Sequence, residues 1–299
     1  MSRKLKADLL LAACALIWGA TFVVVKDALA QASVFVFLSL RFVLASALLA
    51  LLYRRELRNL DGGKLRAGGL IGCLMFGAFA FQTVGLTMTT PSKSAFITGF
   101  FVVLVPVFLA GFGRRHISHW IWAGVFTAVA GLYFLTVPAS GFAELNMGDV
   151  LTLICAVLCA LHIITVGHYV QRYSAGVLVF LQVAATAVLS VAAVPVFALT
   201  GWEAPRVTWA PELIWAVLGT GILATVFTFS AQVWAQRFTA PSHVALLLTL
   251  EPVFAGLTSF AFIGERLGWR GLAGAALILA GILVAELKGP AAAAAVESA

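Results

Sequence analysis

The chain has 299 residues, of which 62% are hydrophobic and 10% charged, with a formal net charge of +7. Soluble globular domains carry about 25% charged residues, so this chain has too few charges to cover a water-facing surface. Unbroken apolar runs, as at 96–112 and 272–285, also exclude a membrane β-barrel, whose strands alternate apolar and polar residues. The composition therefore predicts an all-α membrane protein.

Ten apolar segments have about the length that a helix needs to cross the hydrocarbon core of a bilayer. Residues 1–7 precede them, and the Ala-rich tail at 288–299 is predicted to be disordered. The predicted helices are 8–26, 33–53, 67–88, 92–112, 118–137, 148–170, 174–199, 211–235, 241–263 and 269–287.

The basic residues indicate an orientation. Thirteen of the 19 lysines and arginines lie on the side that holds the N-terminus, five lie on the other side, and Arg41 lies within a helix. Because loops rich in Lys and Arg stay in the cytoplasm, both termini are predicted to be cytoplasmic. The net positive charge follows the same rule and does not indicate a nucleic-acid partner.

Short matches recur at a spacing of about 150 residues. Thr-Pro-Ser at 90–92 opens the fourth helix and Ala-Pro-Ser at 240–242 opens the ninth, while Cys-Ala-Leu occurs at 14–16 and 159–161. These matches predict two five-helix repeats, 8–137 and 148–287. An odd number of spans inverts the second copy, an arrangement common in secondary transporters, whose substrate site lies near mid-membrane between the repeats. We expect the halves to rock around that site.

Two charged residues lie at membrane depth, where ionisable groups are costly and mark functional candidates. Glu251 precedes Pro252 and is predicted to be either a proton-coupling or ammonium-binding acid, or a structural acid at a helix break. Arg41 is predicted either to bind a substrate carboxylate or to satisfy a helix end or reach the interface.

Aromatic and hydrogen-bonding side chains at similar depth are candidates to bind substrate. Aromatic walls suit neutral side chains and accept an ammonium group by cation–π contact, and amides bind zwitterions without a buried charge. Ordinary packing between helices is the alternative for each. His162 is favoured because it lies near the counterpart of Trp18 in the second repeat. The candidates are Trp18, Phe22, Phe79, Gln82, Thr83, Phe101, His162 and Trp234.

No motif of a catalytic, metal or cofactor site is found. The sequence has no glycine-lysine phosphate loop, no His-Glu-x-x-His and no Gly-x-Ser-x-Gly. The four cysteines lie in apolar runs without metal-ligand spacing and are predicted to pack. We therefore expect no enzyme activity and no cofactor. The predicted partners are a small-molecule substrate and the bilayer, and the sequence is compatible with a monomer.

The second half also carries motifs of a known family. Leu-Glu-Pro-Val-Phe at 250–254, Gly-Glu-Arg-Leu at 264–267 and the Gly/Ala-rich 271–285 resemble the second repeat of EamA-type transporters of the drug/metabolite transporter superfamily. Trp-Gly at 18–19 is similar to that family's opening. The first-half loop at 113–116 reads Gly-Arg-Arg-His and lacks the acid often found there.

This resemblance implies ten helices and metabolite export from the cytoplasm across a bacterial inner membrane. Together with the nearly neutral predicted lumen, it favours an exporter of amino acids (neutral or aromatic) or similar small metabolites, either secondary active or facilitative. A cationic-drug exporter of the same architecture is the alternative, since Glu251 provides an acid in the lumen. A lipid-modifying membrane enzyme would need a polar cluster near one interface, which the sequence does not show.

Overall fold

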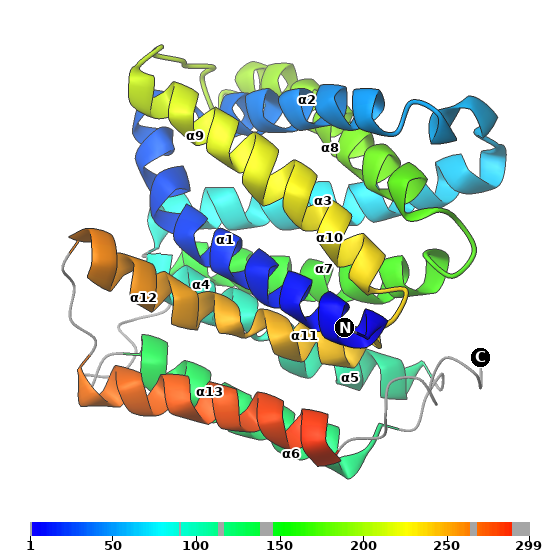
Figure 1. The fold of residues 1–299 in the computed structure, drawn as a ribbon. Coiled ribbons are helices and arrows are strands. Elements are labelled where there is room, and N and C mark those ends of the chain that lie inside the picture. Colours follow the sequence, from blue (N-terminus) through cyan, green and yellow to red (C-terminus); the bar gives the residue numbers. More distant parts are fainter. Residues whose placement is uncertain (1, 90, 113–116, 138–145, 264–267, 289–299) are drawn as a thin grey trace.

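The computed structural model describes residues 2–89, 91–112, 117–137, 146–263 and 268–288. Residues 289–299 of the predicted tail, the Gly-Glu-Arg-Leu motif at 264–267 and the loop at 113–116 lie outside the described residues. The described chain is a bundle of helices (Figure 1). In chain order they are α1 (Arg3–Gln31), α2 (Val34–Leu52), η1 (Glu56–Asn59), α3 (Gly62–Met88), α4 (Pro91–Gly99), α5 (Phe101–Gly111), α6 (His119–Thr136), α7 (Met147–Tyr169), α8 (Ala175–Leu199), α9 (Pro211–Gly221), the π-helix η2 (Ile222–Phe227), α10 (Thr228–Ala235), α11 (Pro241–Leu248), α12 (Leu250–Ile263) and α13 (Trp269–Lys288).

Six of the helical segments are long and apolar enough to cross a membrane, and four shorter apolar helices accompany them. The predicted spans at 92–112 and 241–263 are each divided, into α4 and α5 and into α11 and α12, whereas 211–235 is one continuous helix in which the π-turn η2 joins α9 to α10. Pro252 explains why a new helix begins after Thr249. Backbone N–H groups in the first turn of a helix have no partner within the helix, so a proline, which has no N–H, is tolerated in the first turn of α12.

The first helix is longer than predicted. It begins at Arg3, where the Ser2 hydroxyl accepts a hydrogen bond from the Leu5 N–H at 3.2 Å, and it ends at Gln31. The first turn of α1 is polar, and it extends the helix beyond the apolar run. The Ser2 oxygen stabilises it by accepting a hydrogen bond from one of the backbone N–H groups that have no partner within the helix. The predicted N-terminal segment at 1–7 therefore belongs largely to α1.

The most extensive helix contacts all join the two halves of the chain. They are α6 with α13, α3 with α7 and α8, α2 with α8, and α1 with α12 and α10. These pairs follow a two-fold pattern: the fifth helices of the repeats pair with one another, and so do the second helices. At the α6–α13 crossing, a Cβ added at Gly124 would lie 2.6 Å from the Gly281 carbonyl oxygen, so only glycine allows this approach.

The two sequence halves consequently do not form two separate bodies. One buried core gathers α2, α3, α8 and α9, and the other gathers α5, α6, α11, α12 and α13. Both cores contain helices of both repeats, and α1, α7 and α10 contribute to each. Our expectation that the five-helix halves rock against one another therefore needs correction, since their helices alternate throughout the bundle (Figure 1).

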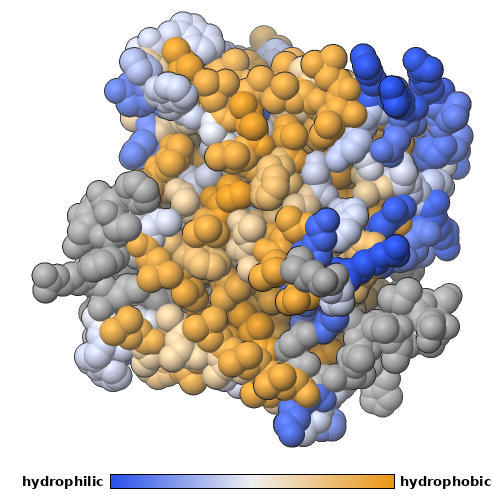
Figure 2. All heavy atoms as spheres, viewed as in Figure 1, coloured by the Kyte–Doolittle hydropathy of each residue, from blue (hydrophilic) through white to orange (hydrophobic). Residues whose placement is uncertain are grey.

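Polar residues gather at one end of the bundle. Helix α1 begins and α13 ends at this end, which we call the N-terminal face (Figure 1). Figure 2 shows apolar residues over the middle of the bundle and hydrophilic residues at this face. This distribution is that of a multi-pass membrane protein. Exposed arginines of the loops and helix ends at this face are Arg54, Arg55, Arg58, Arg66, Arg172 and Arg237.

At the opposite face, the loop between α8 and α9 holds the turn between α1 and α2. The Glu203 carboxylate accepts hydrogen bonds from the Val34 and Phe35 N–H groups, at 2.7 and 3.2 Å, where α2 begins without a side-chain cap of its own. Arg206 donates to the carbonyls of Ala30 and Leu29 near the end of α1. An acid at a helix start and a base at a helix end both complement the helix dipole.

Candidate functional site

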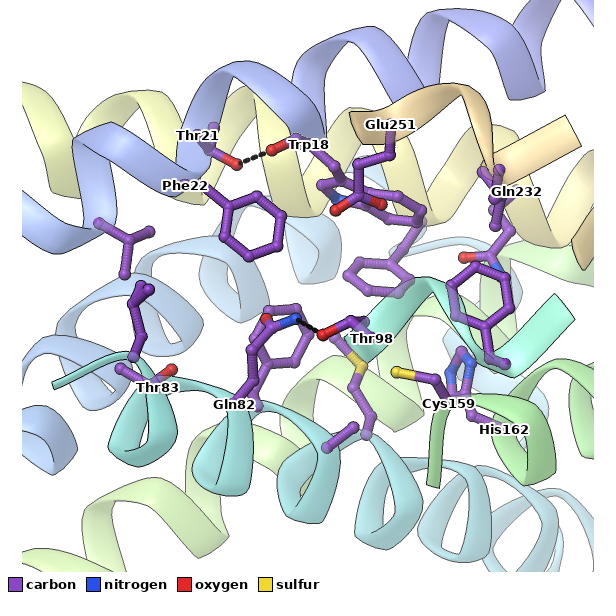
Figure 3. Close-up of a pocket in the computed structure, with 18 of the residues that line it drawn as sticks. Trp18, Thr21, Phe22, Gln82, Thr83, Thr98, Cys159, His162, Gln232 and Glu251 are labelled. Carbon is purple, nitrogen blue, oxygen red and sulfur yellow. Dashed lines mark hydrogen bonds between the residues drawn. The ribbon is translucent and has the colours of Figure 1, made fainter. Parts of the chain in front are cut away.

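A cavity of about 110 Å³ lies in the middle of the bundle (Figure 3). Along α1 it extends from Trp18 to Val25, and along α3 from Met75 to Leu86, in both cases toward the opposite face. Seven of the eight predicted substrate-binding residues line it, together with both deep charges. These lining residues are Trp18, Phe22, Phe79, Gln82, Thr83, Phe101, His162, Arg41 and Glu251.

Trp234 is the predicted residue that lies elsewhere. It lines a second cavity of about 680 Å³ near the N-terminal face, with Ser230 and Arg237 of the same helix and following turn. Phe229 and Gln232 of the same helix instead line the central cavity. Helix α10 therefore separates the two cavities, and Trp234 is on its other side.

Arg41 is 3% exposed and is fixed on one edge only. Its Nε donates to the Thr225 hydroxyl at 2.9 Å, and its Nη2 donates to the Ala224 carbonyl at 3.1 Å. The guanidinium carbon lies 4.6 Å from the ring centre of Phe79 and 5.2 Å from that of Phe42. Nη1 donates no hydrogen bond to the described residues.

The Ala224 carbonyl belongs to the π-helix η2, and it also accepts the Trp18 indole N–H at 3.0 Å. A π-turn shifts hydrogen bonding from i+4 to i+5 and so makes backbone carbonyls available to side chains, which is one reason such turns are frequent at functional sites. Thr225, in the same turn, donates to the Thr220 carbonyl and accepts from Arg41. The turn holds the guanidinium at the wall of the cavity.

Glu251 is the second residue of α12, so its carboxylate lies at the positive end of a helix dipole. Its backbone is fixed by α1, because a Cβ added at Gly19 would lie 2.5 Å from the Glu251 carbonyl oxygen. The carboxylate makes no hydrogen bond or ion pair with the described residues. The positive end of α12 thus stabilises this acid, and its carboxylate lines the cavity without a hydrogen-bond donor among the described residues.

Arg41 and Glu251 do not form an ion pair with each other, although both line the cavity. A charge near the bilayer centre costs about 3 kcal/mol on insertion scales when nothing neutralises it. Two opposite charges held apart across one cavity are therefore each short of a partner. A molecule that carries both charges would satisfy them together.

The rest of the wall combines amides, hydroxyls and aromatic rings. Gln82 Nε2 donates to the Thr98 hydroxyl at 3.2 Å, which joins α3 to α4 (Figure 3). The Phe229 ring lies 5.3 Å from Trp18, 6.1 Å from Phe79 and 6.0 Å from His162, measured between ring centres. This ring cluster lines the part of the cavity nearer the N-terminal face, and Gln232 lies about one turn beyond Phe229 on the same helix.

Sequence comparison agrees with this architecture. The model of the EamA-like transporter family matches the chain twice, over residues 5–137 and 146–287. The chain belongs to the EamA-like transporter family. Its ten helices are accordingly two inverted five-helix repeats, and the protein is a membrane transporter of the drug/metabolite transporter superfamily rather than an enzyme.

Relatives of this EamA-like transporter share the general role. A protein of Archaeoglobus fulgidus named as an uncharacterized transporter is 37% identical over 291 residues, which cover 96% of this chain and 87% of the relative. The uncharacterized transporter YdfC of Bacillus subtilis is 23% identical over 257 residues, 81% of this chain and 78% of the relative. A solved crystal structure with 20% identity superposes with a TM-score of 0.78 over 94% of this chain and 96% of that chain, which shows the same fold.

The cavity of this transporter also includes residues outside the eight predicted substrate-binding side chains. Thr21, Thr98, Phe229 and Gln232 line it. Gln232 and Gln236 are amides four residues apart at membrane depth, a pattern that suggests hydrogen bonding within the bundle. The spacing does not indicate which of the two amides faces the cavity. Gln236 donates to the Ile163 carbonyl at 2.8 Å and joins α10 to α7 instead.

The described residues contain no cluster of three or more His, Cys, Asp or Glu side chains that would hold a metal ion. Cys155 and Cys159 lie one turn apart on α7 with their sulfurs at 3.7 Å, and Cys159 also lines the cavity. The cavity can bind a small molecule through charge, hydrogen bonds and aromatic contact.

Proposed function

We propose that this EamA-like transporter exports neutral amino acids or similar small zwitterionic metabolites across the bacterial inner membrane. The observation that carries the proposal is the separated pair Arg41 and Glu251 in one cavity. An α-amino acid brings a carboxylate to the free edge of the guanidinium and an ammonium group to the unpartnered carboxylate. Charged hydrogen bonds of this kind are worth about 1.5–3 kcal/mol each.

The volume of the cavity favours a small substrate. At roughly 10–15 Å³ for each water-sized group, about 110 Å³ holds about 7 to 11 non-hydrogen atoms. Neutral amino acids with small or branched side chains have this size, whereas tryptophan is larger. The rings of Trp18, Phe22 and Phe101 offer apolar contact to the carbon atoms of such a side chain.

The proposed orientation has both termini in the cytoplasm. The exposed arginines at the N-terminal face support it through the positive-inside rule. In this orientation the central cavity extends toward the periplasm, and helix α10 and the ring cluster around Phe229 lie between it and the second cavity. The 680 Å³ cavity beside Trp234 would then be the cytoplasmic vestibule from which substrate reaches the site once the cluster opens.

Alternating access is the proposed mechanism, with moving bodies that differ from the sequence repeats. The two buried cores each mix helices of both halves, so the core of α2, α3, α8 and α9 would move against that of α5, α6, α11, α12 and α13. Arg41 lies on α2 and Glu251 on α12. A zwitterion that bridges them favours the state in which the bodies are closest, and a ligand shifts the equilibrium only through such differential affinity.

Export of lipophilic cations is the second candidate, because Glu251 and the aromatic wall also suit a cation. Arg41 argues against it. Its guanidinium lines the same cavity, so it would repel a cationic substrate. This repulsion is strong at membrane depth because little water is present to screen it.

A transport screen in proteoliposomes tests the proposal. Exchange of radiolabelled alanine, valine, threonine and leucine is compared with uptake of tetraphenylphosphonium, with and without a pH gradient. We expect amino-acid exchange that falls about 10- to 150-fold in efficiency in Arg41→Met and in Glu251→Gln, the range of one charged hydrogen bond.

Arg270→Met is the matched control for Arg41. Arg270 also stacks on two aromatic rings, of Tyr133 and Phe134, but it does not line the cavity. Arg270→Met should leave amino-acid exchange unchanged.

Two other outcomes would contradict parts of the proposal. Saturable cation uptake that Glu251→Gln abolishes, with no exchange of any amino acid, would select the second candidate. A pH dependence of exchange that is identical in wild type and Glu251→Gln would exclude Glu251 as a proton carrier.

A further inference from the structure

Gln232 has an unusual environment for a buried amide. The residue is 2% exposed, lines the central cavity, and its Oε1 accepts no hydrogen bond from the residues that the structure describes. No hydrogen bond of its amide nitrogen to the described residues is found either. Buried polar groups are nearly always paired, and each exception calls for an explanation.

Other buried polar atoms without a partner do not share this position. Ser94, Ser190, Thr228 and Gln236 each have one, and none of them lines the central cavity. Within the described residues, Gln232 is the lining residue of that cavity with such an atom. Its unpaired amide therefore faces the space where a ligand would be.

His162 provides a second acceptor nearby. Its Nε2 lies 2.8 Å from Gln182 Oε1, and because that amide oxygen only accepts, the ring hydrogen is on Nε2. Nδ1 of the neutral ring is then an acceptor without a partner among the described residues. His162 and Gln232 both line the cavity, and both lie at its end away from Thr83 (Figure 3).

The charges that bind the main-chain groups of an amino acid lie nearer the middle. On the α9–α10 span, Thr225 contacts Arg41, and Gln232 follows seven residues later, about 10 Å further toward the N-terminal face at 1.5 Å per residue. The Arg41 and Gln232 side chains both line the cavity, so they extend into this gap from its two ends. A substrate held by Arg41 and Glu251 would thus direct its side chain toward Gln232 and His162.

We propose that Gln232 is a specificity-determining residue that accepts a hydrogen bond from the side chain of the substrate, with His162 as a second acceptor. This inference rests on the proposed function and narrows it to neutral amino acids whose side chains carry a hydroxyl or amide donor. A site built to hydrogen-bond a substrate group discriminates against the analogue that lacks it, because the buried acceptor is left unpaired.

Pairs of amino acids with similar shape and different donors test the inference. Exchange in proteoliposomes is measured for threonine against valine, serine against alanine, and glutamine against methionine. We expect wild type to favour the donor-bearing member of each pair by about tenfold or more. Gln232→Leu should remove most of this preference, whereas Gln232→Glu, which keeps acceptor oxygens at the same length, should retain it.

Ser190→Ala is the matched control, since it removes an unpartnered buried hydroxyl away from the cavity and should leave every ratio unchanged. Equal exchange within all three pairs by wild type would overturn the inference while leaving the proposed function intact, whether or not Gln232→Leu folds. Preference that survives in a folded Gln232→Leu would overturn it as well. Absence of exchange for all six amino acids would overturn the proposed function itself.

Discussion

The contact between α1 and α12 at Gly19 links packing directly to the substrate site. A Cβ at this position would lie 2.5 Å from the Glu251 carbonyl oxygen and 2.9 Å from the Ala255 nitrogen, whereas ordinary contacts begin at about 3.4 Å. Gly19→Ala must therefore separate the two backbones by about 0.9 Å, and it must do so at the residue whose carboxylate lines the cavity.

Overpacking of this kind costs about 1–3 kcal/mol of stability. A displacement of about 1 Å in a binding group can cost up to about 10²-fold in efficiency. We therefore expect Gly19→Ala to remain folded and to raise the KM for amino-acid exchange about tenfold or more. Thermal unfolding in detergent and concentration-dependent exchange in proteoliposomes measure the two effects separately.

Two other glycines separate the loss of function from the loss of stability. Gly131→Ala creates an equally close contact, 2.6 Å from the Gly274 carbonyl oxygen, but at the α6–α13 crossing away from the cavity. It should lower the unfolding temperature without changing KM. Gly69→Ala, on α3 with open space around its Cα, should change neither. The reasoning is refuted if Gly131→Ala raises KM as much as Gly19→Ala does.

Three further predictions concern the walls of the two cavities and the loop between α8 and α9. Trp18→Ala should raise KM, because the indole lines the central cavity, whereas Trp234→Ala should leave it unchanged if the second cavity only admits substrate. A small neutral methanethiosulfonate should block exchange by modifying Cys159, with protection by substrate and resistance in Cys159→Ala. Glu203→Gln should lower stability by about 0.5–2 kcal/mol, the worth of a helix cap, in a thermal unfolding measurement, because it weakens the cap on Val34.

Each of these has a clear contrary result. A higher KM in Trp234→Ala than in Trp18→Ala would place the substrate in the second cavity. Equal inhibition of Cys159→Ala would show that the reagent acts elsewhere. An unfolding temperature of Glu203→Gln equal to that of wild type would mean that the loop between α8 and α9 does not hold α2.

The number and order of the spans could be predicted from the sequence because lipid demands long apolar runs. The break at Thr249 and the π-turn around Ala224 could not be predicted. Hydropathy is the same whether a backbone carbonyl accepts a hydrogen bond from residue i+4, from residue i+5 or from a side chain. Arg41 and Glu251 were recognisable at once, because a charge at membrane depth is costly in any arrangement.

The direction in which uncharged residues face was harder to predict. Gln232 and Trp234 are two residues apart on α10, yet the first lines the central cavity and the second lines the other one. In a soluble helix the apolar stripe marks the buried face, but in a membrane the lipid-facing side is apolar too, so that signal is weak. The mixed cores were likewise invisible, since repeats in a sequence do not specify which helices pair.

The central claim is that Arg41 and Glu251 bind the two charges of one molecule. It is tested most directly by exchange measurements with threonine, with threoninamide, which lacks the carboxylate, and with 3-hydroxybutanoate, which lacks the amine. We predict saturable exchange of threonine and at least about tenfold weaker exchange of each analogue, the loss expected for one charged hydrogen bond. Exchange of either analogue as efficient as that of threonine would contradict the claim.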